Sequence, residues 1–92
     1  MKIKMTRFKN GWAEGTVGPY RWQAKVYEEG SQFGINRGRI SKLAIWDEKK
    51  RKESGFLAAC TVKYDRGWDI KPKTLKAQQA LLTVLKLLEK ED

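Results

Sequence analysis

Lysine and arginine are the residues of this chain best suited to chemistry, and that chemistry is the binding of a polyanion. The chain has 92 residues with 20 Lys and Arg against 11 Asp and Glu, so its formal net charge is +9 at pH 7. Lys and Arg side chains displace counterions from phosphates, and this drives association with nucleic acids. The charge therefore predicts a nucleic acid, or another strongly acidic surface, as the partner.

The positive charges are clustered along the chain. Residues 1–11 carry four Lys or Arg and residues 31–42 carry three, with no acidic residue in either segment. Residues 49–52 read Lys-Lys-Arg-Lys. Clustering of this kind favours a basic surface patch over an evenly mixed surface.

The segment 20–27 alternates between apolar and polar residues, which indicates a strand with one buried and one exposed face. The exposed face, continued by strands over 40–46 and 56–64, would be a platform of cations around an aromatic ring. Such a platform suits single-stranded nucleic acid, because cations hold phosphates and a base stacks on the ring. A solvated basic face is the alternative interpretation. We expect phosphate contacts from Arg21, Lys25, Lys42 and Lys63, and base stacking on Trp46.

Two other basic segments would extend this platform. Arg37 and Arg39 lie in a glycine-rich loop that could cradle a phosphate. Lys49, Lys50, Arg51 and Lys52 would lie at the tip of a long hairpin turn. The alternative for the second segment is a solubilising turn, since acidic residues flank it on both sides.

Catalysis finds little support in the residue types. The chain has no histidine, the commonest general base. Cys60 lies in the middle of an expected strand, where a small buried apolar side chain is the simpler interpretation. Asp65 and Asp69 could hold a divalent ion, but no glycine-rich ligand loop accompanies them. We therefore expect a protein that is not an enzyme and that uses no cofactor and no metal.

The elements that must position these residues form one α+β domain over residues 1–92. Residues 1–10 read as loosely ordered or as an edge strand. Strands are expected over 12–17, 20–27, 40–46 and 56–64, followed by a helix over 74–90 with Thr74 as its N-cap. The fold class is a four-stranded antiparallel sheet with the C-terminal helix packed on one face (ββββα). A homodimer that covers more of the sheet would stabilise so small a fold.

The composition also indicates a compartment. Cys60 is the only cysteine, so no disulfide can form within the chain, and a reducing compartment is favoured. The N-terminus is too polar for a signal peptide, and the longest apolar stretch is too short and too charged to span a bilayer. These observations predict a cytoplasmic protein without membrane contact.

Six short strings of the sequence carry a family resemblance. They occupy residues 11–15, 18–20, 23–27, 33–35, 38–43 and 64–69. The strings resemble a family of small uncharacterised proteins encoded by phages, prophages and conjugative elements of Gram-positive bacteria. The resemblance extends over most of residues 8–88 and implies an origin in a mobile element, with no activity attached.

Two functions remain open on this basis. The first is a non-enzymatic protein that binds nucleic acid, single-stranded or through the backbone, with little sequence specificity. The second is a phage-encoded inhibitor of a host defence system, of the anti-CRISPR type, that binds a host nucleoprotein complex or enzyme. Both would use a cationic surface, so the composition does not separate them.

Overall fold

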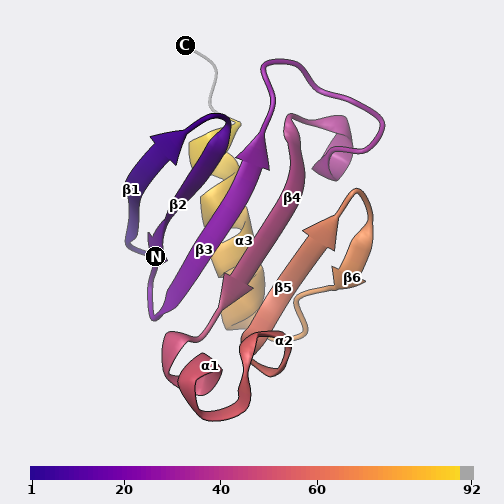
Figure 1. Cartoon of the computed structure of the whole chain (residues 1–92). Helices are drawn as coiled ribbons and strands as arrows, with labels where there is room; N and C mark the ends of the chain where they lie inside the picture. The colour runs from indigo at the N-terminus through magenta and orange to yellow at the C-terminus, as the bar shows by residue number, and fades with distance from the viewer. Residues whose placement is uncertain (90–92) are drawn as a thin grey trace.

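The core of the fold is one antiparallel sheet that the C-terminal helix covers on one face (Figure 1). The computed structural model describes residues 1–89. Within them, six strands follow one another in sequence order, and each pairs antiparallel with its neighbours. The strands are β1 (Ile3–Lys9), β2 (Trp12–Val17), β3 (Tyr20–Val26), β4 (Ile40–Trp46), β5 (Cys60–Asp65) and β6 (Trp68–Ile70).

The predicted α+β class, with an antiparallel sheet and a C-terminal helix, is confirmed. The predicted four strands and single helix are wrong, because the described residues form six strands and three α-helices. The two additional strands lie at the edges of the sheet. Six of the seven residues of β1 are exposed, so the strand lacks the alternation by which a half-buried strand is recognised. Strand β6 has only three residues, and the tight turn before it contains Arg66 at a φ of 56°.

The connector between β4 and β5 is helical and is not the expected hairpin turn. Helix α1 (Glu48–Ser54) begins after Asp47, whose carboxylate accepts a hydrogen bond from the Lys50 N–H at 3.1 Å. Gly55, at a φ of 92°, separates α1 from the short helix α2 (Phe56–Ala59). Strand β5 therefore begins at Cys60, and the prediction of a strand from Phe56 onward is wrong for its first four residues.

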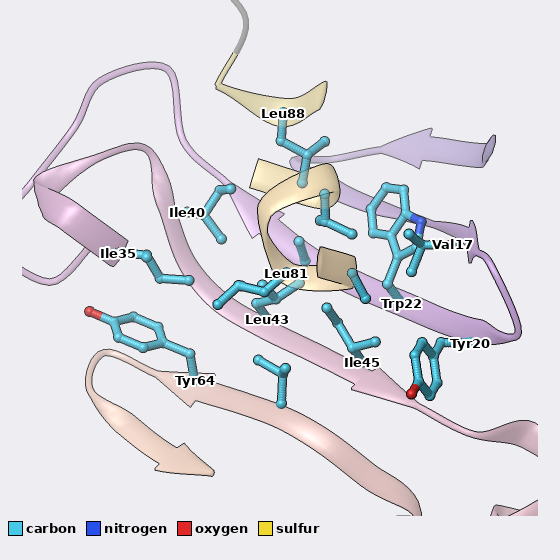
Figure 2. Close-up of a cluster of buried hydrophobic side chains, with 14 of the residues drawn as sticks. Val17, Tyr20, Trp22, Ile35, Ile40, Leu43, Ile45, Tyr64, Leu81 and Leu88 are labelled. Atoms are coloured by element: carbon cyan, nitrogen blue, oxygen red, sulfur yellow. The ribbon is translucent and has the colours of Figure 1, made fainter. Parts of the chain in front are cut away.

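Helix α3 (Leu75–Leu88) begins at the predicted N-cap, since the Thr74 hydroxyl accepts a hydrogen bond from the Ala77 N–H at 3.1 Å. The helix was expected to reach residue 90, which lies outside the described residues. Figure 2 shows Trp22, Leu43 and Ile45 of the sheet around this helix. The buried residues of α3 are Ala77, Ala80, Leu81, Val84 and Leu88.

The opposite face of the sheet is open. Figure 1 looks onto this face, with α3 behind the sheet. Of the helices in the described part of the chain, α3 is the one that packs against several strands, namely β2, β4 and β5, and it does so on the core face. The side chains that alternate with the core residues therefore meet solvent and are available to a ligand.

Gly15 on β2 allows β1 to join the sheet. A Cβ atom at this position would lie 1.9 Å from the Lys4 carbonyl oxygen, which is too close for any side chain. Gly15→Ala should therefore displace β1 and lower the free energy of unfolding by about 1–3 kcal/mol, as overpacking does. Hydrogen exchange of the β1 amides should accelerate, while that of the β4 amides should change much less.

Gly67→Ala is the matched control, because a Cβ atom there meets nothing within 4 Å. It should leave both the unfolding midpoint and β1 exchange close to those of the wild type. Unchanged protection of β1 in the Gly15→Ala protein would contradict this account of the edge strand.

Candidate nucleic-acid interface

Cations from four strands gather on the open face. Residues directly opposite one another on neighbouring strands share a face, so the pairing register assigns each side chain to one side of the sheet. The register places the predicted residues Arg21, Lys25, Lys42 and Lys63 together on the open face. It adds three cations that the sequence interpretation had not selected, namely Lys4, Arg7 and Lys9 of β1.

Two of these cations have carboxylate partners. Arg21 lies 3.6 Å from Glu48, and the Lys63 ammonium lies 2.7 Å from Asp69. The hydrogen bond to Asp69 raises the pKa of Lys63, so this lysine stays charged but is partly neutralised by its partner. Within residues 1–89 the other cations of the face form no ion pair, which leaves them available for phosphates: Lys4, Arg7, Lys9, Lys25 and Lys42.

Lys25 is held in a defined position on this face. Its ammonium donates a hydrogen bond to the Asn10 carbonyl at 2.8 Å and lies 5.5 Å from the centre of the Trp12 ring and 5.6 Å from that of Tyr27. Asn10 and Gly11 both have a positive φ, as the two central residues of a tight hairpin turn require. A Cβ atom on Gly11 would lie 2.9 Å from the ammonium, so the glycine allows the lysine to lie against this turn.

Two hollows mark the open face, and Trp12 and Gln23 line both of them. The first, of about 290 Å³, is also lined by Arg7, Lys9 and Glu14. The second, of about 140 Å³, is also lined by cations of β4 and β5, Lys42 and Lys63. Trp12 is 39% exposed, so its indole ring is accessible beside these cations.

Trp46, the predicted stacking residue, belongs to a different cluster. Its ring packs edge-on against Phe56 with the ring centres 5.4 Å apart, and its indole N–H donates to Glu48 at 3.3 Å. Glu48 also accepts a hydrogen bond from Arg51, which lowers the pKa of this carboxyl group below its usual range. Trp46 therefore anchors the start of α1 at one end of the face, and its ring is engaged by protein groups.

The two loop arginines are not brought to the open face together. Arg39 pairs with Glu89 at 3.6 Å, and its guanidinium donates a hydrogen bond to the Leu88 carbonyl. A cation at that position stabilises the C-terminal end of α3 through the helix dipole. Arg37 is exposed in the short turn Ile35–Arg37, within the loop that connects β3 to β4.

The basic run 49–52 forms the exposed surface of α1. Arg51 is paired with Glu48, whereas Lys49, Lys50 and Lys52 form no ion pair within the described chain. Figure 1 shows α1 at the end of the sheet opposite the loop between β3 and β4. The start of α1 is next to the Arg21 end of the open face, since Glu48 contacts Arg21.

The residues considered for metal or thiol chemistry have other partners. Asp65 lies 3.4 Å from Arg66, and Asp69 is bound to Lys63. Residues 1–89 contain no group of three His, Cys, Asp or Glu side chains placed to hold a metal ion. Burial raises the pKa of the Cys60 thiol, which favours the protonated form.

The structure is a small α+β domain. A helix covers one face of its sheet, and the other face is open and basic. The family model described as Domain of unknown function (DUF7678) matches residues 11–89, and the chain belongs to this family. No curated protein matches the chain, and no solved structure matches it. None of the helices formed by residues 1–89 has the length and apolar character needed to cross a membrane.

Proposed function

We propose that this protein is a non-enzymatic nucleic-acid-binding module that holds phosphate groups on the open face of its sheet. The observation that carries the proposal is a group of cations on one face that form no ion pair within residues 1–89, while α3 covers the other face. The group consists of Lys4, Arg7, Lys9, Lys25 and Lys42.

The pairing of Lys25 with Lys42 supports this proposal. The two residues are directly opposite each other on β3 and β4. The Cβ atoms of directly opposite residues lie about 5 Å apart, and like charges at such positions destabilise a sheet. Asp65 is directly opposite Lys42 on its other side and offsets part of this repulsion. An anion bound near both lysines would offset the rest, which supports a bound polyanion as the partner.

The proposed binding has little sequence specificity, because contacts to phosphates carry no sequence information. We further propose that the protein acts in the cytoplasm as part of a phage, prophage or conjugative element. The support for this origin is the sequence resemblance described above, and the support for the compartment is the single, unpaired Cys60.

Salt dependence tests the proposed function. Five phosphate contacts to a single strand predict a slope of log K against log salt of roughly −3.5. The affinity for a fluorescently labelled 20-nucleotide oligonucleotide should therefore fall about a hundredfold between 50 and 200 mM NaCl, as measured by fluorescence anisotropy. Absence of binding at 50 mM NaCl, to both single-stranded and duplex probes, would overturn the proposal. Inhibition of a host defence complex would then be the function to test.

A further inference from the structure

One row of side chains crosses the open face from β1 to β4. Lys9 is directly opposite Trp12, Trp12 is opposite Lys25, and Lys25 is opposite Lys42. The Cβ atoms of neighbours in such a row lie about 5 Å apart. The row therefore presents an aromatic ring with a cation on each side, followed by one more cation, across four adjacent strands.

The Trp12 ring is accessible in the way that stacking requires. It contributes to both hollows of the face, and no protein ring within residues 1–89 packs against it. Lys25 lies 5.5 Å from its centre and is itself fixed by the Asn10 carbonyl. An ammonium group offers three hydrogen-bond donors, so Lys25 can bind a phosphate while it keeps this contact.

The other tryptophans with exposed surface differ in this respect. Trp46 is packed against Phe56. Trp68, which is 38% exposed, lies edge-on to Tyr64 with the ring centres 5.0 Å apart, and its register position assigns it to the helix-covered side of the sheet. Trp12 is therefore the tryptophan that combines an accessible ring with neighbouring cations that form no ion pair in the described part of the chain.

From this arrangement we propose that the ligand is a single-stranded nucleic acid, with a base stacked on Trp12 and its phosphates held by Lys9, Lys25 and Lys42. This inference rests on the proposed function and names its substrate class. A duplex cannot use the site in this way, because its bases are already stacked and paired, whereas an unpaired base offers a free aromatic face. Gln23, which lines both hollows, supplies an amide that can hydrogen-bond the edge of the stacked base.

Trp12→Leu tests the inference, because it keeps an apolar side chain and removes the flat ring. Stacking on an aromatic side chain contributes roughly 1–3 kcal/mol per base, so the affinity for a 20-nucleotide single strand should fall about tenfold or more. The affinity for a 20-base-pair duplex and the slope of log K against log salt should stay unchanged, since the phosphate contacts remain. Trp12→Phe, which retains a ring, should lose less affinity than Trp12→Leu.

The matched control is Trp68→Leu, which removes a ring of nearly the same exposure from the other side of the sheet. It should leave binding of both probes unchanged. If Trp12→Leu binds the single strand as the wild type does, or if the wild type binds the duplex more tightly, the inference is wrong while the proposed function stands. If the wild type binds neither probe at low salt, the proposed function itself has failed. Circular dichroism of each variant verifies that it is folded.

Discussion

A variant in which Lys4, Lys9 and Lys42 are all changed to Gln should bind single-stranded DNA about a hundredfold more weakly than the wild type in 100 mM NaCl. Each phosphate contact to a single strand contributes about 0.7 to the slope of log K against log salt, so the loss of three contacts removes roughly 2 log units between 1 M and 0.1 M salt. The salt slope of the variant should become shallower by about 2 as well. Fluorescence anisotropy over a range of NaCl concentrations measures both quantities.

A control variant removes the same number of positive charges from the other side of the molecule. Lys73 and Lys76 lie at the start of α3 and Lys86 near its end, and all three are exposed. Changing them to Gln produces the same net charge as the first variant. If binding depends on the open face, this control should lose at most a few-fold through the general field. Equal losses in both variants would show that the total charge decides binding and would leave the open face without a special role.

The triple variant should lose affinity without losing stability. Lys4 and Lys9 are exposed on an edge strand. Lys42 is directly opposite Lys25 on one side and Asp65 on the other, so removing its charge removes a repulsion and an attraction that largely offset each other. The variant should therefore unfold at nearly the same temperature as the wild type. A variant that is folded but binds weakly locates the effect in the interface.

Alternation predicted the strands that have one buried and one exposed face. The observed bounds of β2 and β4, 12–17 and 40–46, equal the expected ones, because apolar residues on one side of each strand enter the core. β1 has no buried side, so its pairing with β2 could not be inferred from apolar residues. The signal that could have located it is Asn10-Gly11, a dipeptide typical of two-residue hairpin turns.

α1 illustrates a different limit of sequence interpretation. Its residues are almost all charged and none is buried, so no apolar period marks a helix. The available signal was local, since Asp47 precedes an acidic residue in the first turn and basic residues occupy the last turn. Capping and dipole effects, without a buried face, account for this helix.

The sequence predicts one part of the candidate site, namely which residues share a strand face. Arg21, Lys25, Lys42 and Lys63 share one face because they occupy alternate positions in strands whose other face is apolar. The partners of Arg39 and Trp46 could not be inferred from spacing. Arg39 binds Glu89, which is fifty residues away in the sequence. Trp46 donates a hydrogen bond to Glu48 of α1, and the sequence predicts a turn where this helix forms.

The second large effect is expected at Trp22, which lies on the buried face of β3, behind the open face. Trp22 is fully buried, and its indole N–H donates to the Thr16 carbonyl at 3.1 Å. Trp22→Ala should lower the free energy of unfolding by about 3–5 kcal/mol, because it leaves a cavity under α3. A shift of 1 kcal/mol changes the melting temperature of a domain of this size by about 4–8 °C, so a decrease on the order of 20 °C is expected.

Trp22→Phe separates the two contributions of this residue. Phenylalanine keeps most of the apolar contact but leaves the Thr16 carbonyl without its donor, which should cost about 1–3 kcal/mol. Urea denaturation followed by far-ultraviolet circular dichroism measures the stability of both variants. A midpoint for Trp22→Ala close to that of the wild type would contradict the packing described.

Trp22 lies between Arg21 and Gln23, so the strand that buries it also carries residues of the open face. Nucleic-acid binding by Trp22→Ala should therefore fall with the folded fraction, while the salt slope of the molecules that remain folded stays that of the wild type.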